Sequence, residues 1–129
     1  MNEDITRYLE RAHEALESAR ILHQSQHYLD SVSRAYYAMY HVAMAALIPE
    51  GVSVKTHKGT IGLFYQRLIA TGKLPPDLGR AFSFAFEKRT SGDYEAYFEL
   101  EEVESAKILA DSESFLTIVC QYIDENFRD

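Results

Sequence analysis

The sequence has little cysteine and lacks the segments that mark exported, membrane-spanning or disulfide-bonded proteins. Its 129 residues include one cysteine, Cys120, which excludes a disulfide within the chain and a zinc site built from cysteines. No basic-then-apolar leader opens the chain and no apolar run reaches about eighteen residues, so we expect a cytoplasmic protein that does not enter a membrane. A chain of this length buries a core large enough to fold without a disulfide or a metal.

Several catalytic motifs are also absent. The sequence has no glycine-rich phosphate loop, no motif around a nucleophilic serine and no paired-carboxylate site. His23 and His27 stand about one helical turn apart with Asp30 close behind, but the pair lacks a convincing third ligand for a metal. We therefore expect neither a metal nor a cofactor. The apolar neighbours of Cys120 predict a packed thiol.

Apolar residues recur at helical spacing along the whole chain. Their pattern predicts five helices, over residues 3–24, 28–48, 56–72, 76–92 and 100–126. Pro49 ends the second helix, Gly72 ends the third, and Thr56 caps the start of the third. Valine and isoleucine never alternate with polar residues over the length of a strand, so we expect no sheet. The short connections predict one domain, residues 1–129, folded as an all-α, up-and-down bundle of four to five helices.

Charge is distributed unevenly along the chain. The net charge of −7 argues against indiscriminate binding of nucleic acids. Residues 55–89, however, hold seven basic side chains and two acidic ones, whereas residues 90–129 hold two basic and eleven acidic ones. The basic middle third is compatible with a local anion-binding face. The alternative is a set of solvated helix faces whose charges balance within a dimer.

The segment Ser33–His41 places an arginine, three tyrosines and a histidine inside an apolar helical run. At about 3.6 residues per turn, Arg34 and His41 share one side of this helix. Because a lone buried charge is costly, these two side chains need partners or a cleft. In one interpretation His41 acts as a general base or acid beside Arg34, which binds a phosphate. In the other, Arg34 pairs with a carboxylate such as Asp30 or Asp93, and His41 bonds a tyrosine.

A second polar group stands at the end of the fourth predicted helix. Arg89 continues the inward-facing stripe of that helix, which is expected to end near Gly92. Asp93 and Tyr94 then follow the break, so their side chains can turn back toward the same end of the bundle. An arginine, a carboxylate and a phenol there form either a phosphate-recognition corner or an ion-paired clasp.

A third group surrounds the expected cap of the third helix. Lys55, His57 and Lys58 adjoin Thr56, and the free amides of a first helical turn attract anions. The segment is therefore a candidate anion site. Capping alone would also explain Thr56, and His57 would then be a surface residue.

The fourth helix carries more apolar width than one core contact needs. Phe84 lies on the opposite side from Leu78 and Phe82, and Phe86 widens the apolar face further. From this surplus we predict a homodimer that buries it. The alternative is that Phe84 packs under the following loop.

Three blocks of residues together resemble the HEPN domain (higher eukaryotes and prokaryotes nucleotide-binding). They are Ser-Arg-Ala-Tyr-Tyr-Ala-Met-Tyr-His at 33–41, Lys-Thr-His-Lys-Gly at 55–59, and Arg89 followed by Asp93-Tyr94. The resemblance covers nearly the whole chain and is greatest to the small stand-alone prokaryotic members. It implies a four- or five-helix bundle that forms a homodimer. It also implies a minimal nucleotidyltransferase as partner, with the HEPN protein commonly a toxin or a relative of one.

The resemblance further implies RNA chemistry. Many HEPN proteins are metal-independent RNases whose motif is an arginine, four to six residues, then a histidine, in a cleft across the dimer. Here Arg89 is followed by Tyr94 where that histidine would stand, and a phenol with a pKa of about 10 is a poor base at neutral pH. Arg34 and His41 match the spacing on another helix, and His57 is the imidazole available from the third.

We therefore predict a nucleotide- or RNA-binding partner of a minimal nucleotidyltransferase, in a toxin–antitoxin-like pair. The alternatives are a metal-independent endoribonuclease with Arg89 and His57 as catalytic residues, or a purely structural dimerisation module. The residues expected to bind the ligand are Arg34, His41, Lys55, His57, Lys58, Arg89, Asp93 and Tyr94.

Overall fold

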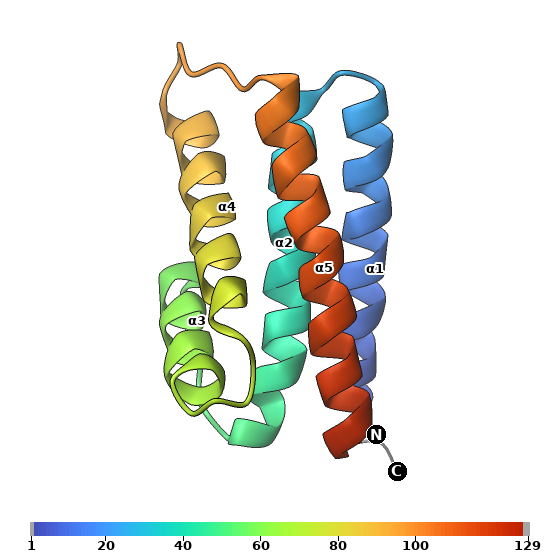
Figure 1. Cartoon of the computed structure of the whole chain (residues 1–129), viewed down its shortest axis with the longest axis vertical. Helices are drawn as coiled ribbons and strands as arrows, with labels where there is room; N and C mark the ends of the chain where they lie inside the picture. Colours follow the sequence, from blue (N-terminus) through green and yellow to red (C-terminus); the bar gives the residue numbers. More distant parts are fainter. Residues whose placement is uncertain (1, 128–129) are drawn as a thin grey trace.

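A computed structural model describes residues 2–127 of the chain as a bundle of helices. The elements are α1 (Glu3–Gln24), α2 (Tyr28–Leu47), the 3₁₀ turn η1 (Ile48–Glu50), α3 (His57–Phe64), the π-helical turn η2 (Tyr65–Ile69), α4 (Pro76–Tyr94) and α5 (Glu102–Phe127). The four long helices run alternately up and down, and the short α3 lies beside the lower part of α4 (Figure 1). No strand occurs in residues 2–127, and the predicted all-α bundle is confirmed.

Helix α2 lies at the centre of the bundle and contacts α1, α3, α4 and α5 (Figure 1). Eleven of its 20 residues are buried, as expected for a helix that is apolar on nearly every side. Five of those buried residues are alanines, whose small side chains let the neighbouring helices approach α2 closely. Polar side chains on α2 consequently lie close to side chains of several other helices.

An aromatic core fixes the shorter helices against α2. Phe64 of α3, Phe82 of α4 and Phe115 of α5 are fully buried, with ring centroids 5.2–5.6 Å apart. Phe82 also contacts Tyr36 of α2, at 5.9 Å between centroids. Buried aromatic pairs of this kind contribute about 0.5–1.5 kcal/mol beyond the area they bury. The core therefore holds α3 and α4 in a defined position beside α2.

Most of the predicted turn signals act as expected. The chain leaves α2 just before Pro49, and Gly51 ends η1 with a φ of 70°, a left-handed conformation that favours glycine. Thr56 caps α3, because its Oγ1 accepts a hydrogen bond from the amide of Gly59 at 2.9 Å.

The end of the third helix differs from the prediction of a continuous helix to Gly72. After α3 the backbone widens into the π-helical η2, in which the amide of Ala70 donates to the carbonyl of Tyr65 at 2.8 Å. In this wider turn the adjacent residues Leu68 and Ile69 are both buried.

Helix α4 also continues beyond its predicted end. Gly92 lies within the helix, and a side chain there would come within 3.2 Å of Leu29 of α2, so the glycine permits a close helix contact and is not a break. Asp93 and Tyr94 therefore lie within the helix and not beyond a break, and only Asp93 pairs with Arg89, whereas Tyr94 is exposed. Asp93 instead stands one helical turn beyond Arg89.

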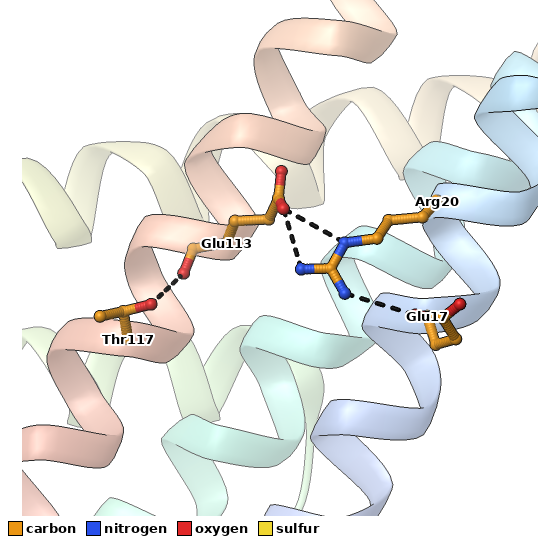
Figure 2. Close-up of polar contacts among 4 residues, drawn as sticks. All are labelled: Glu17, Arg20, Glu113 and Thr117. Atoms are coloured by element: carbon orange, nitrogen blue, oxygen red, sulfur yellow. Dashed lines mark hydrogen bonds and ion pairs between the residues drawn. The ribbon is translucent and has the colours of Figure 1, made fainter.

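Polar contacts tie α1 to α5 along the bundle. Arg20 donates from Nε and Nη2 to Oε2 of Glu113 at 3.2 and 2.9 Å, and its Nη1 donates to Glu17 at 3.4 Å (Figure 2). These contacts raise the pKa of Arg20, chiefly through the hydrogen bond to Glu113. Nδ1 of His23 lies 2.8 Å from Oγ of Ser105, so this histidine has a structural partner.

Within residues 2–127 no group of three histidine, cysteine, aspartate or glutamate side chains is placed to hold a metal ion. None of the described helices combines the length and the apolar character needed to cross a membrane. Cys120 is partly buried, and burial raises the pKa of its thiol.

The surplus apolar width of α4 is partly covered by other residues of the chain. Phe86 contacts Tyr36 with centroids 5.6 Å apart, and the Nζ atoms of Lys88 and Lys107 lie 5.5 and 4.9 Å from the ring of Phe84. Phe84 is thus partly buried between α4 and α5. The homodimer stays a prediction that rests on the family resemblance.

Candidate functional site

Three tyrosines of α2 form the base of a polar cluster, and we call Tyr36, Tyr37 and Tyr40 the tyrosine cluster. Their ring centroids lie 5.4–6.2 Å apart. Tyr36 is fully buried, and burial raises the pKa of Tyr36 and of Tyr40 above the ordinary phenol value. Both hydroxyls therefore remain protonated at neutral pH and act as neutral hydrogen-bonding groups.

His57 lies on the tyrosine cluster from the first turn of α3. Its ring stacks on Tyr40 with centroids 4.4 Å apart and planes inclined by 19°, and its Nδ1 is 2.8 Å from the hydroxyl of Tyr36. The pKa of His57 is lowered, first by burial and then by the nearby guanidinium of Arg89. The imidazole is consequently neutral at pH 7. Its Nε2 makes no hydrogen bond with any residue in the range 2–127.

Arg89 reaches the same tyrosines from α4. Its guanidinium carbon lies 5.4 Å from the ring centroid of Tyr36 and 5.1 Å from that of Tyr37, and its Nη2 donates to the hydroxyl of Tyr37 at 3.1 Å. Its Nε is 3.3 Å from Oδ2 of Asp93, but the geometry is not that of a hydrogen bond. Both aromatic rings and a carboxylate thus surround this cation.

Arg34 lies over the same ring as Arg89. Its guanidinium carbon is 4.7 Å from the centroid of Tyr37. Neither Asp30 nor Asp93 forms an ion pair with it in the described part of the chain, and Asp93 pairs instead with Arg89. The expected structural ties of Arg34 are therefore not formed, and a tyrosine ring takes their place.

His41 completes the row of polar side chains on α2. Its ring lies 6.1 Å from Tyr37 and 5.5 Å from Tyr40, centroid to centroid, and Tyr8 of α1 stacks on it at 6.1 Å. Its buried Nδ1 has no hydrogen-bond partner within residues 2–127, and the alternative in which His41 bonds a tyrosine is not seen in this part of the chain. Burial, followed by the charges of Arg11 and Arg34, lowers the pKa of His41 to about 4.

The remaining predicted residues lie outside this cluster. Lys55 and Lys58 flank His57 but are exposed, with no ion pair in the described structure. Tyr94 is 83% exposed, and it makes no hydrogen bond or ring contact with the cluster residues within residues 2–127. The structure therefore brings together Arg34, His41, His57, Arg89 and Asp93, and it separates Tyr94 and the two lysines from them.

Sequence reasoning missed the contribution of α1. Tyr8 stacks on His41, and Arg11 lies close enough to lower the pKa of that histidine. The available signal was the spacing of Arg7, Arg11 and Ala15, which places two arginines on one helix side next to the apolar stripe. That spacing is common on exposed helices, so only the packing of α1 against α2 distinguishes it.

The cluster combines two guanidinium groups with two neutral imidazoles. One carboxylate, from Asp93, stands within ion-pair distance of the guanidiniums in the described chain. Guanidinium groups of this kind bind phosphate oxygens through paired hydrogen bonds. A neutral imidazole beside them can accept or donate a proton. The arrangement is suited to binding a phosphate group, and its chemistry is compatible with proton transfer near that group.

Comparisons with known proteins agree with the resemblance drawn from the sequence. The profile of the HEPN domain matches residues 5–123. A UPF0332 protein of Gloeobacter violaceus is 37% identical over 116 residues, which cover 89% of this chain and 92% of the relative. A UPF0332 protein of Thermotoga maritima is 31% identical over 115 residues, covering 89% and 87%. A Methanocaldococcus jannaschii protein named "Putative toxin MJ0605" is 31% identical over 125 residues, covering 97% and 92%.

The depressed pKa of His41 predicts a loss of stability in mild acid. The pKa is about 4 in the folded chain and 6.5 for an ordinary histidine, so the unfolded chain takes up the proton first as the pH falls. Stability is therefore lost between about pH 6.5 and pH 4. Allowing for solvent screening of this half-buried ring, we expect His41 to account for about 1–2 kcal/mol.

Urea unfolding at pH 7 and pH 4.5 measures this loss in the wild type and in His41→Gln. The variant should lose less stability than the wild type over this interval, because glutamine does not titrate. His57 remains in both proteins, so its own contribution cancels. An equal loss in the two proteins would contradict the prediction.

Proposed function

The chain belongs to the HEPN domain family, and from this premise we propose that it is a toxin-type protein that binds RNA phosphate groups at the tyrosine cluster. The observation that carries the proposal is the position of Arg89. Its guanidinium is held over Tyr36 and Tyr37 and beside His57, with Asp93 as its one ion-pair partner within residues 2–127. A cation supported by rings keeps hydrogen-bonding capacity for a phosphate.

The name of the Methanocaldococcus relative supports a toxin-like role. Because this chain aligns with nearly the whole of that protein, the same class of role is proposed here. Base stacking on aromatic rings commonly accompanies phosphate contacts in proteins that bind single-stranded RNA. Tyr37 and Tyr40 are partly exposed, and a base would stack on a ring face that Arg34, Arg89 and His57 leave uncovered.

Arg89→Gln should weaken RNA binding, because it removes the cation and retains most of the side-chain volume. Loss of a charged hydrogen bond of about 1.5–3 kcal/mol corresponds to a weakening of about 10- to 100-fold. Fluorescence anisotropy with a labelled single-stranded ten-nucleotide RNA measures the dissociation constant. Arg80→Gln is the matched control, because Arg80 lies on the same helix, is exposed and pairs with Asp77. Equal affinities of the two variants would contradict the proposal.

We further propose that the protein is a cytoplasmic homodimer that acts with a minimal nucleotidyltransferase in a toxin–antitoxin-like pair. The family resemblance supports this part. Light scattering at micromolar concentration should give twice the 14.8 kDa mass of one chain. Co-expression with a short nucleotidyltransferase encoded beside this gene should yield a co-purifying complex. A monomeric mass, or no complex, would count against the respective half of the proposal.

A second candidate function is metal-independent cleavage of RNA, favoured by the neutral imidazole of His57 beside Arg89. When Nδ1–H of His57 donates to the Tyr36 oxygen, Nε2 is free to take the proton of a ribose 2′-hydroxyl. The 2′-oxygen then bonds to phosphorus while the bond to the 5′-oxygen breaks, and water protonates the leaving oxygen. The products are a 2′,3′-cyclic phosphate and a 5′-hydroxyl, and Arg89 stabilises the charge on the phosphate oxygens.

Incubation of RNA with the purified protein in EDTA tests this second candidate. Cleavage should persist in chelator, and His57→Gln should reduce its rate at least about 100-fold, the usual contribution of a general base. His27→Gln, which removes an exposed histidine at the start of α2, is the control. If the wild type binds RNA but does not cleave it, cleavage is excluded and RNA binding remains as the proposed function.

A further inference from the structure

A groove between α1 and α2 adjoins the tyrosine cluster and is not used by the function proposed above. Its volume is about 240 Å³. The residues that line it are Arg7, Arg11, Glu14, Ala15, Ser18, Arg34 and His41. Three arginines and a histidine thus face one small space, with one carboxylate among them.

The cations of this groove are incompletely neutralised. Within residues 2–127, neither Arg11 nor Arg34 takes part in an ion pair or a hydrogen bond, and Arg34 is held only by the ring of Tyr37. Arg7 pairs with Glu10 at 3.3 Å, but both of these side chains are largely exposed, so water weakens the pair. Glu14 is the carboxylate that lines the groove.

The pKa of His41 reflects the positive potential in this groove. After burial, Arg11 and Arg34 are the largest influences that lower its pKa, and His57 adds to them. The other groups around the ring are the phenols Tyr8, Tyr37 and Tyr40, and no carboxylate is among the causes. The charged groups that act most strongly on this ring are therefore cationic. The Nδ1 atom of His41 is buried and lacks a partner in the described structure, which is a costly state for a polar atom.

The groove neighbours the Arg89 site, because the ring of Tyr37 lies beside a guanidinium of each. The guanidinium carbons of Arg34 and Arg89 lie 4.7 and 5.1 Å from the same Tyr37 centroid, so they are at most about 10 Å apart, the sum of those two distances. Two cationic positions this close can engage neighbouring phosphates of one flexible ligand. Together with Arg11, they form a cationic track from α4 across α2 to α1.

We propose that the groove lined by Arg11, Arg34 and His41 binds a second phosphate group of the ligand whose first phosphate lies at Arg89. The inference rests on the proposed function and extends it. In an RNA strand the second phosphate is that of a neighbouring nucleotide. The same chemistry is offered by the polyphosphate of a free nucleotide, and the experiment distinguishes these two sources.

The test compares two double variants with equal loss of charge. Arg11→Gln with Arg34→Gln removes the cations of the groove. Arg67→Gln with Arg80→Gln removes two exposed arginines away from it and is the matched control. Circular dichroism confirms that each protein is folded before its affinity is measured.

Three ligands separate the possible occupants: a ten-nucleotide RNA, a dinucleoside monophosphate with one phosphate, and a ribonucleoside triphosphate. The groove variant should bind the ten-nucleotide RNA about tenfold more weakly than the control does, as expected when one charged hydrogen bond to the RNA is removed. The log–log slope of its salt dependence should fall by about 0.7 for each phosphate that the variant no longer neutralises. Binding of the dinucleoside monophosphate should be the same in both variants. A selective loss for the triphosphate alone would identify a nucleotide as the source.

A second measurement does not depend on RNA binding. Inorganic pyrophosphate is titrated into the wild type while the imidazole resonances of His41 are followed by NMR. An anion beside the ring favours its protonated form, so the pKa of His41 should rise from about 4 when pyrophosphate binds. The groove variant should not show this pyrophosphate-dependent rise.

The outcomes distinguish this inference from the function on which it rests. If Arg89→Gln abolishes RNA binding but the groove variant matches its control, the RNA-binding function stands and the second phosphate site is overturned. If the wild type binds no RNA, the proposed function fails, and the pyrophosphate titration alone decides whether the groove is an anion site. An unchanged pKa of His41 in pyrophosphate overturns the inference in either case.

Discussion

The hydrogen bond between the buried hydroxyl of Tyr36 and Nδ1 of His57 connects the core of this bundle to its polar surface. The ring of Tyr36 contacts Phe82 and Phe86, so its position is determined by the packing of α2 against α4. Its hydroxyl then orients the imidazole that α3 carries. Because an unpaired hydroxyl at this depth would destabilise the fold, the requirement to satisfy it also places His57.

The arginines of the bundle have two different kinds of surroundings. Between α1 and α5, Arg20 is bonded to two carboxylates, and such a pair has little capacity left for a ligand. Around the tyrosine cluster, Arg34 and Arg89 are held over aromatic rings. A ring face attracts a guanidinium by about 0.5–2 kcal/mol and leaves most of its N–H groups free. This difference is the physical reason for assigning ligand binding to one face of the bundle.

Family membership and geometry support different parts of the functional argument. The HEPN profile shows the family to which the chain belongs. The toxin-type role is proposed from that membership and from the names of two relatives. The convergence of Arg89, His57 and Arg34 on adjacent tyrosines supports the proposal that the site recognises a phosphate. The lowered pKa of His57 adds a neutral imidazole at that position, and this supports RNA cleavage as the second proposed function.

The helical class and most helix ends follow from the amino-acid sequence, because they depend on local spacing, proline positions and the cap at Thr56. Arg34, His41, His57 and Arg89 were also candidates from the sequence. Which of these residues meet was not predictable, since contacts between helices depend on packing distances that no local pattern encodes. Leu29 against Gly92 is one example, because the missing side chain at Gly92 lets α4 pass close to α2 without a break in the helix. The arginine of α1 that joins the site is another, because its role arises from the packing of two whole helices.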